Sequence, residues 1–537
     1  MREGRSTARA SLQRCKSLAR TIKSCREPVW PALTKVRLPE KEVADKLVAC
    51  YLRTIETVFR IVHIPTFKRS YEAIWEPQSP PDSIALAQIK LVMAIGTTVN
   101  GDMTSLRSLA LQWIYEVQTW ISRPGLKARL NLQTLQTDIL LILAREMVGI
   151  DSSSSWVSVG MLVRKAVQMG LHRDPTKLTK GSELASEMRR RLFNTILEIA
   201  LQSSILFGSP PFIYHEEFDT EVPSNLDDDQ LTVEKSSPEP NNTLTQSTMA
   251  RLLSHTFSER LAIVNFLNNK NSGGSYEEAL SLDSQLRASY KIAKTVSLVS
   301  QSSKDREGKS FDFASTFVDV LINYYLLSLH MPFHERSLSN AAYAFSRKVM
   351  VDASLKIWRN LFQPVAAMQT STTDQGHNDL MALTTSPWCF FHTVLRQVSM
   401  AISTELRAQL REEEDSLGPI PIRADLVSVM EQAKHCFFQC IESWNTNVKG
   451  YVLMRIVAAP IEAYMQGTKQ DKLAQYLAKA VEDALAECLV VLEKIASDLE
   501  PHEETSVVED DVILTTTTTP GITLEVDMED DWNLMVR

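Results

Sequence analysis

Apolar residues recur along most of this chain at intervals of three and four residues, the spacing that places them on one face of an α-helix. Glycine, which weakens helices, contributes only 17 of the 537 residues, about 3% against a usual ~7%. The sequence therefore predicts an all-α fold, an irregular multi-helix domain. The longest apolar stripe consists of Leu473, Leu477, Ala480, Ala484, Cys488, Leu492, Ile495 and Leu499.

The predicted helices fall into two groups. The first group begins at Lys41 with a helix that we expect to end at Pro65, since proline disfavours a helical conformation at the residue before it. The second group begins after Met249 and continues to about residue 499, with polar loops at 300–310 and 368–379. Further helices of the first group are predicted at 84–99, 104–121, 131–147, 154–170 and 184–207.

The remaining segments lack helical periodicity. Residues 222–247 are rich in Pro, Ser, Asn and Asp, a composition typical of a linker or a long surface loop. Residues 1–40 are polar, basic and rich in proline, and we interpret them as a disordered basic arm or linker. Residues 501–537 are expected to form a disordered acidic tail. The sequence thus predicts two helical halves, at 41–221 and 248–500, between an arm and a tail.

Charge is unevenly distributed along the chain. The net charge is −8, yet residues 1–37 carry ten Lys and Arg against Glu3 and Glu27, and residues 501–537 carry ten Asp and Glu against Arg537. Two interpretations stay open. The ends are either solvated and without a partner, or they are an anion-binding or nuclear-import head and an acidic interaction tail.

The sequence lacks signals for secretion or membrane insertion. It contains no run of about 18 apolar residues, and its basic first residues have no apolar signal-peptide core. We therefore expect an intracellular, soluble protein. The seven cysteines form no C-x-x-C pair and are expected to be reduced thiols; they are residues 15, 25, 50, 389, 436, 440 and 488.

The densest group of motifs lies between Trp156 and Arg191. It comprises Trp156, Val159-Gly160-Met161, Arg164-Lys165-Ala166, Gly170-Leu171-His172-Arg173-Asp174-Pro175 and Glu187-Met188-Arg189-Arg190-Arg191. Shorter motifs lie before and after this group along the chain. They are Phe59 to Phe67 with its His63-Ile64-Pro65 element, Gly208-Ser209-Pro210-Pro211, Phe218-Asp219, Val222-Pro223, Leu329-His330-Met331-Pro332-Phe333 and Ser346-Arg347.

This ordered set resembles the fungal-specific transcription factor domain, the middle homology region of zinc binuclear cluster regulators. The resemblance implies an all-α regulatory domain that acts in the nucleus and controls a metabolic pathway, often a secondary-metabolite biosynthetic gene cluster. It also implies a regulator rather than an enzyme.

The motif residues have physical interpretations of their own. Gly170 suits a left-handed helix end, after which Leu171 can pack back on the last turn. The arginines at 164, 173 and 189–191 stand beside apolar residues, where buried charges need carboxylate partners such as Asp174, Glu187 and Asp219. We interpret this cluster as a structural network that joins two helices, and Trp156 as a core residue. A small-molecule or partner site at the same place is the alternative.

The chain departs from the family pattern at its beginning. Family members usually begin with a six-cysteine cluster that holds two zinc ions, whereas only Cys15 and Cys25 precede residue 50 here. We therefore expect no cofactor in this chain, and zinc only if a cluster lies upstream. Either the coding sequence starts further upstream, or the protein regulates without reading DNA itself. Its expected partners are the transcription machinery or another regulator, with DNA contacted indirectly or through an upstream module, and no membrane; dimerisation is left open.

Three short segments match parts of catalytic motifs, but the other residues that those motifs require are missing. His172-Arg173-Asp174 copies kinase catalytic-loop letters, but Thr179 replaces the metal-binding Asn. His215-Glu216 and His334-Glu335 have no second histidine on the same helical face, as a zinc protease needs. We therefore expect that the chain is not an enzyme.

The last ten residues before the C-terminus alternate carboxylates with bulky apolar groups, in Asp527-Met528-Glu529-Asp530-Asp531-Trp532-Asn533-Leu534-Met535-Val536. Such alternation is typical of acidic activation segments. Trp532, Leu534 and Met535 are the residues that would dock in a coactivator groove. A tail without function is the alternative.

Two hypotheses follow for the whole chain. The first is a transcription regulator of a metabolic pathway that acts through its helical domain. The second is a helical co-regulator that binds and modulates an intact zinc-cluster transcription factor without contacting DNA.

Overall fold

The computed structural model describes the chain in fifteen stretches: 2–26, 38–76, 82–100, 103–122, 130–150, 155–178, 181–232, 238–241, 243–269, 274–298, 308–362, 375–414, 422–443, 447–467 and 472–497. These stretches are helical and contain no strand, which confirms the predicted all-α class. The described stretches all belong to one compact unit, residues 1–499. The predicted acidic tail, with Trp532, Leu534 and Met535, lies outside the described residues.

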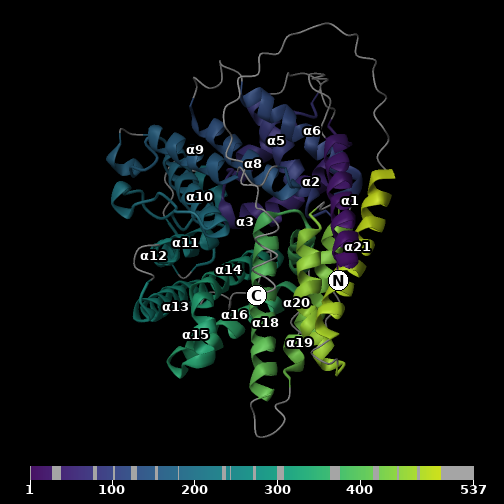
Figure 1. Ribbon diagram of the computed structural model, residues 1–537. Helices are drawn as coiled ribbons and strands as arrows, with labels where there is room; N and C mark the ends of the chain where they lie inside the picture. The colour runs from purple at the N-terminus through teal and green to yellow at the C-terminus, as the bar shows by residue number, and fades with distance from the viewer. Residues whose placement is uncertain are drawn as a thin grey trace, which may run out of the picture. The chain divides into compact units, whose positions relative to one another are not determined.

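Helices make up most of the described part of this unit (Figure 1). The first half contains α1 (Arg2–Arg26), α2 (Lys41–Arg53), α3 (Ile55–Phe59), α4 (Ile64–Ala73), α5 (Ser83–Thr97), α6 (Met103–Ile121), α8 (Leu132–Val148), α9 (Ser155–Gln168) and α10 (Glu183–Phe207). The second half contains α11 (Thr248–His255), α12 (Phe257–Asn268), α13 (Tyr276–Leu298), α14 (Gly308–His330), α15 (His334–Ser339), α16 (Ala344–Phe362), α17 (Gln375–Thr385), α18 (Cys389–Glu414), α19 (Ala424–Glu442), α20 (Lys449–Met465) and α21 (Leu473–Ser497).

The helices predicted from apolar periodicity are confirmed to within about two residues at most of their ends. Examples are α5, predicted at 84–99, and α10, predicted at 184–207. Local capping explains several of these ends. Asn131 and Thr134 form a reciprocal capping box at the start of α8, and Ser182 caps α10 by accepting a hydrogen bond from the Ala185 amide.

The helix predicted between Lys41 and Pro65 is wrong as one element. The backbone leaves the helical conformation at Thr54 and again at Arg60, which has a left-handed φ of 51°. Pro65 begins a helix rather than ending one, because it lies in the first turn of α4, where its missing N–H needs no intrahelical acceptor. The apolar spacing continued across both breaks, so periodicity alone could not reveal them.

Part of the predicted basic arm forms a helix. Over α1, Cys15 and Ile22 are buried, and Ala8, Leu12 and Leu18 are partly buried against the core. These five positions recur at three- and four-residue intervals, so they share one face, and α1 packs with that face on α21 (Figure 1). The density of Lys and Arg between these positions concealed the apolar stripe.

The segment 222–247, predicted as a linker or a long surface loop, has buried residues of its own. In its described residues, Asn225, Asp228 and Ser247 are all buried. Asn225 donates hydrogen bonds to the carbonyls of Pro240 and Thr243, which closes the segment on itself. The segment therefore belongs to the same compact unit as the helices before and after it.

Direct contacts join the two halves. Arg53 of α2 makes a bidentate ion pair with Asp379 of α17, with distances of 2.7 and 2.8 Å. The rings of Phe59 and Phe317 meet edge to face, with centroids 6.2 Å apart. The middle of the first half is α5, which is buried from Ala87 to Thr97 and packs on α2, α6 and α8.

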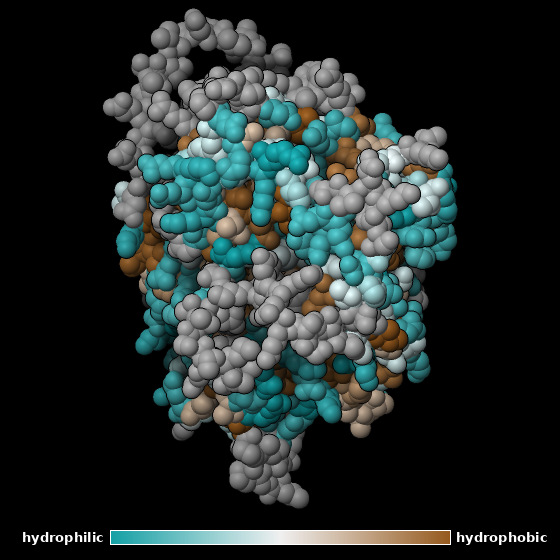
Figure 2. Space-filling model, turned by 180° about the vertical axis from the view of Figure 1, so that it is seen from behind, coloured by the Kyte–Doolittle hydropathy of each residue, from teal (hydrophilic) through white to brown (hydrophobic). Residues whose placement is uncertain are grey.

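Polar residues dominate the face of the molecule drawn in Figure 2, and apolar residues appear on it in separate patches. None of the described helices has the length and apolarity that a membrane span requires. Among the described residues, no group of three or more His, Cys, Asp or Glu side chains could hold a metal ion.

Candidate functional site

The C-terminal end of α9 positions the central motif. Gly170 has a φ of 72°, a conformation that side-chain-bearing residues rarely adopt. The Leu171 amide donates to the Ala166 carbonyl at 3.0 Å, and the Leu171 side chain is fully buried. Arg189 of α10 donates to the Met169 and Gly170 carbonyls at 3.1 and 2.7 Å. An arginine from one helix thus satisfies the carbonyls at the end of another.

Asp174 ties the turn after α9 to α10. Its carboxylate accepts two hydrogen bonds from Arg190, at 2.8 and 2.9 Å, and others from the amides of Thr176 and Glu221. Burial alone would raise the pKa of Asp174, but the Arg190 guanidinium and the Thr176 and Glu221 donors outweigh it and lower that pKa well below its usual value. Asp174 is therefore a fixed anion at neutral pH.

Asp219 extends this group toward the surface. It accepts a hydrogen bond from the Asp174 amide at 2.8 Å and pairs with Arg173 at 3.0 Å and Lys177 at 2.9 Å. The hydrogen bond from Asp174 and the Lys177 ammonium lower the pKa of Asp219 to about 2. Both cations are exposed, so this end of the network is open to solvent.

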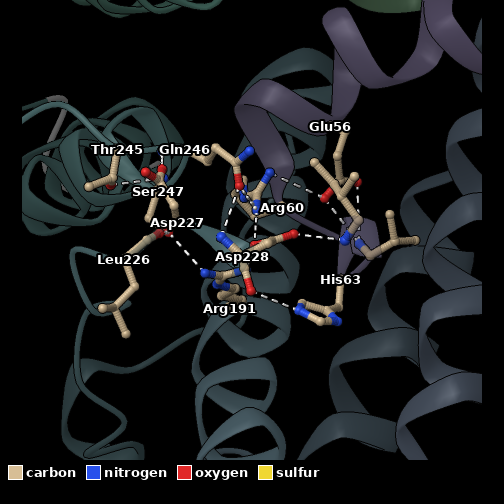
Figure 3. Close-up of polar contacts among 12 residues, drawn as sticks. Glu56, Arg60, His63, Arg191, Leu226, Asp227, Asp228, Thr245, Gln246 and Ser247 are labelled. Carbon is tan, nitrogen blue, oxygen red and sulfur yellow. Dashed lines mark hydrogen bonds and ion pairs between the residues drawn. The ribbon is translucent and has the colours of Figure 1, made fainter. Parts of the chain in front are cut away.

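The deepest part of the network centres on Asp228 (Figure 3). Arg191 of α10 lies 2.6 Å from its Oδ1 atom, and Arg60 reaches the same oxygen from the end of α3. The other carboxylate oxygen accepts a hydrogen bond from the Ile64 amide at 2.7 Å. The Asp228 carbonyl lies 3.0 Å from His63 Nε2. One aspartate therefore joins three segments that are far apart in the sequence.

Arg191 has further partners on both sides of Asp228. Its Nε atom donates to Glu187 at 3.1 Å, and its Nη2 atom donates to the Ser247 hydroxyl at 3.1 Å. Glu187 in turn accepts hydrogen bonds from the Ser224 amide. The Arg191 side chain is completely buried, which is tolerable only because each end of its guanidinium is paired.

Glu56 is the second buried carboxylate of this cluster. It accepts hydrogen bonds from the Tyr51 hydroxyl at 2.6 Å and from the amides of Ile61 and Val62, and it lies 3.8 Å from Arg60. These donors hold the left-handed turn at Arg60 in place.

The two buried carboxylates of the cluster, Glu56 and Asp228, have pKa values shifted in opposite directions. Burial raises the pKa of Glu56 to about 7, although Arg60 and the Tyr51 hydroxyl act in the opposite direction. Burial alone would raise the pKa of Asp228 too, but the guanidinium groups of Arg60 and Arg191 outweigh it and lower that pKa to about 2. The two pKa values differ because Asp228 accepts hydrogen bonds from two arginines, whereas Glu56 lies 3.8 Å from one arginine.

The structure brings together some of the predicted site residues and not others. Leu171, Asp174 and the three arginines at 189–191 lie in or beside the network. Arg164 does not: it is exposed and contacts the Gly160 carbonyl of its own helix at 3.5 Å. The placement of Arg164 in the network is therefore wrong, because its position on α9 faces away from α10.

Other motif residues lie beside the network. His172 is half-buried, and its carbonyl accepts a hydrogen bond from the Asp219 amide at 3.0 Å. Trp156 is only half-buried, and its ring packs against Phe212, which is 58% exposed. Gly208 ends α10 with a φ of 58°, and Pro210 after it is exposed.

Asp228, Glu56 and Ser247 belong to the network but were not among the predicted site residues. Asp228 stands in a run of three aspartates within the segment that was predicted to be a linker or a long surface loop, where no buried partner was expected. The signal that pointed to it was the triplet of arginines at 189–191, because that much buried positive charge requires more carboxylates than the motif itself contains.

The second-half motifs form a comparable cluster. His330 lies 2.8 Å from the Ser346 hydroxyl and 3.1 Å from Asp283. These three residues imitate a nucleophilic triad, but Ser346 and His330 are completely buried, so a substrate has no access to the hydroxyl. Arg347 pairs with Glu405 of α18 at 2.7 Å. The motif residues thus connect α13, α14, α16 and α18.

A pocket beside the network is too small for a metabolite. It measures about 10 Å³, roughly the space that one water molecule needs. Its lining residues come from α3, α10, α11 and α12; they are Val58, Phe59, Asn194, Thr195, Glu198, Ala250, Leu253, Ser254 and Phe257.

The chain is similar to known proteins over most of its length. The model of the fungal specific transcription factor domain matches residues 49–301. The transcription factor lepE of Aspergillus flavus is 32% identical over 505 residues, which cover 90% of this chain and 59% of that protein. The transcription factor opdR of Penicillium oxalicum is 30% identical over 93% of this chain and 66% of that protein.

A third relative is the aspyridones cluster regulator apdR of Emericella nidulans. It is 30% identical over 77% of this chain and 57% of that protein. The chain therefore spans about three fifths of the length of the curated relatives it matches. No solved structure is significantly similar to it.

Proposed function

This chain belongs to the family of proteins that carry the fungal-specific transcription factor domain, and we propose that it regulates transcription of a secondary-metabolite biosynthetic gene cluster. The observation that carries this proposal is the similarity to named transcription factors over about nine tenths of the chain. The name of a further relative, a cluster regulator, supplies the class of target genes. The proposed place of action is the nucleus.

The geometry of the motif residues supports a regulatory scaffold. The network of Asp174, Arg190, Arg191 and Asp228 fixes α9, α10, α3 and the segment 222–247 relative to one another. We propose that it is structural, because its groups are engaged with one another and the pocket beside it holds about one water. On this view the domain transmits a signal through its helix packing rather than through chemistry at the network.

Transcript profiling in the native host tests the proposed function. Deleting the gene is expected to reduce the transcripts of a co-located set of biosynthetic genes, and a tagged chain is expected at their promoters by chromatin immunoprecipitation. Unchanged transcripts would contradict the proposal. Promoter occupancy that disappears when a second, zinc-cluster regulator is deleted would instead favour the co-regulator that does not contact DNA.

The acidic tail is proposed to be the activating segment. Replacing Trp532 and Leu534 with alanine, in a chain tethered to a reporter promoter, should lower reporter output several-fold, because these side chains would fill the coactivator groove. Replacing Thr516 and Thr518 with alanine is the matched control and should leave output unchanged. Equal output from both variants would remove this role from the tail.

A further inference from the structure

Two large apolar side chains of α9 point to solvent. Val157 is 63% exposed and Met161 is 54% exposed, although both lie within the helix. They are four residues apart and therefore share one face of α9. This face is opposite to the buried residues Val159, Leu162 and Ala166, and α9 packs on α8 and α10 (Figure 1). Exposed apolar residues that are grouped in this way are typical of surfaces that another molecule covers.

Phe212 adds an aromatic ring next to the start of α9. The ring is exposed and contacts that of Trp156, with centroids 5.9 Å apart. The backbone of Phe212 has a left-handed φ of 50°, a conformation that costs energy for a residue with a side chain. Ile213, the next residue, is buried. The chain thus holds the Phe212 ring at the surface in a strained conformation, which is a recurring property of binding sites.

Gly160 leaves the middle of the same α9 face flat. The nearest neighbour of a Cβ atom at this position is the flexible end of Arg164, at 3.7 Å. A glycine inside a helix weakens the helix, and at Gly96 the close approach of α2 accounts for its presence. No part of the described chain approaches Gly160 in that way. The flat position would allow a second helix to cross α9 at a short distance.

Arg164 gives this face a positive charge. It is exposed, donates to the Gly160 carbonyl at 3.5 Å, and has no carboxylate partner among the described residues. The sequence of α9 contains no Asp or Glu, and the first carboxylates after Phe212 are Glu216 and Glu217. A two-fold contact between two copies of this face would bring like charges together. The charge therefore favours a different protein that supplies a carboxylate.

We propose that the outer face of α9 binds an amphipathic, acidic helix of a partner protein. This α9 surface consists of Val157, Gly160, Met161, Arg164 and Phe212. The partner helix crosses α9 at Gly160, its apolar residues contact the exposed apolar side chains, and a carboxylate of the partner pairs with Arg164. The proposal goes beyond the proposed function and does not depend on it.

The first test measures peptide binding to residues 1–537 by fluorescence anisotropy. The probe is a fluorescein-labelled peptide of Leu, Glu and Ala, about four helical turns long, with its leucines on one face and its glutamates beside them. The variant that combines Val157→Gln and Met161→Gln should bind it at least about tenfold more weakly, because the apolar anchors are lost. Unchanged binding would overturn the proposal.

A matched control removes apolar surface elsewhere. Ile292 of α13 and Val490 of α21 are 67% and 68% exposed, and Ile292→Gln combined with Val490→Gln should bind the peptide as the parent chain does. Circular dichroism melting of both double variants excludes unfolding as the cause of any loss. Equal losses in both variants would mean that the peptide adheres to any exposed apolar residue, and would overturn the proposal.

A charge exchange tests the role of Arg164. The parent chain should bind the glutamate peptide more tightly than the same peptide with Lys in place of Glu. Arg164→Glu should reverse this order, because the carboxylate then repels glutamate and attracts lysine. Arg359→Glu changes an exposed arginine of α16 and should leave the order as it is in the parent. An order that Arg164→Glu does not reverse would contradict the proposed pairing.

Gly160→Leu separates binding from stability. Because the space beside Gly160 is open, the melting temperature of this variant should not fall below that of the parent. Its affinity for the glutamate peptide should nevertheless fall at least about tenfold, since the added side chain keeps the second helix away from α9. Full affinity in this variant would show that no helix crosses at Gly160.

Sedimentation equilibrium tests the other possible occupant, a second copy of the chain. If the parent chain forms a dimer that Val157→Gln and Met161→Gln abolish, the surface joins two copies and the proposal is overturned. A monomeric parent that binds the glutamate peptide supports it. Transcript profiling of the deletion strain does not involve this surface, so the proposed function can hold while the proposed binding fails.

Discussion

Arg191 and Arg164 belong to the same sequence motif but occupy opposite environments. Arg191 is completely buried and bonded to Glu187, Asp228 and Ser247, whereas Arg164 is exposed and contacts only a carbonyl of its own helix in the described structure. A buried charge that loses a partner leaves the remaining charges uncompensated. Arg191 is therefore part of the buried network, and Arg164 is a surface residue.

The first prediction compares these two residues. Arg191→Ala should lower the free energy of unfolding by about 3–5 kcal/mol, because Asp228 would keep a buried charge with one partner fewer. Arg164→Ala should change it by less than about 0.5 kcal/mol. Urea unfolding followed by circular dichroism measures both. Similar effects from the two substitutions would contradict the assignment of Arg191 to the network.

The second prediction concerns pH and Glu56. Burial raises its pKa in the folded state from 4.5 to about 7, so the folded state binds this proton more tightly than the unfolded state. Its contribution to stability is therefore complete below pH 4.5 and is lost as pH rises to about 7, a difference of about 3 kcal/mol.

The substitution Glu56→Gln removes that titration. From pH 5 to pH 8, the unfolding free energy of the parent chain should fall by about 2.5 kcal/mol relative to that of the variant. Urea unfolding of both chains at the two pH values provides the measurement. A difference that stays constant across this range would mean that Glu56 is ionised in the folded state at both pH values.

At the scale of elements, helix contacts depend on single small residues. A Cβ atom on Gly96 of α5 would lie 2.1 Å from the Leu47 carbonyl oxygen of α2, a distance that real contacts do not show. On Gly160 of α9, the nearest neighbour of such an atom is the flexible end of Arg164, at 3.7 Å. Both glycines lie within helices, but only Gly96 permits close approach of a second helix.

The third prediction follows from that contrast. Gly96→Ala should destabilise the chain by more than about 2 kcal/mol, because α2 and α5 must move apart. Gly160→Ala should stabilise it by up to about 1 kcal/mol, since alanine has the higher helix propensity and fits the open space. Thermal unfolding ranks the two variants. If Gly96→Ala melts at or above the parent's temperature, the close approach of α2 and α5 is not required.

The sequence predicted whole helices better than it predicted their breaks. Periodic apolar residues are a property of one element, so α5, α8, α10 and α21 could be recognised without their neighbours. The turn at Arg60 is held by Glu56 of α3 and by Asp228, which lies 168 residues away in the sequence. Such non-local partners leave no periodic signal, and this is why the turn and the buried role of 222–247 were not predicted.

The candidate site was predictable to a similar extent. The pairing of Asp174 with an arginine of 189–191 followed from charge and spacing. The choice of Asp228 as the partner of Arg191 did not, because it requires the two residues to be brought together across 36 intervening positions.

At the scale of the whole molecule, the two helical halves are one unit. The Arg53–Asp379 pair and the Phe59–Phe317 contact join the first helical half to the second, and Asp228 of the segment 222–247 is buried. Contacts of this kind couple the unfolding of both halves.

The fourth prediction tests that coupling. Hydrogen exchange of α8, in the first half, and α18, in the second, should lose protection at the same urea concentration, because neither half keeps its buried surface alone. Mass spectrometry of peptides from the two helices measures this. Loss of protection at two well-separated urea concentrations would show that the halves are independent domains.

The packing of α1 on α21 joins the beginning of the compact unit to its end. About 450 residues separate the two helices, and a ribosome that adds ~5–20 residues per second needs about 20–90 s to make them. During that time the apolar face of α1 has left the ribosome and has no α21 to cover it. The nascent chain is therefore expected to bind chaperones that recognise exposed apolar helices. The packing of α1 on α21 is one of the last steps of its folding.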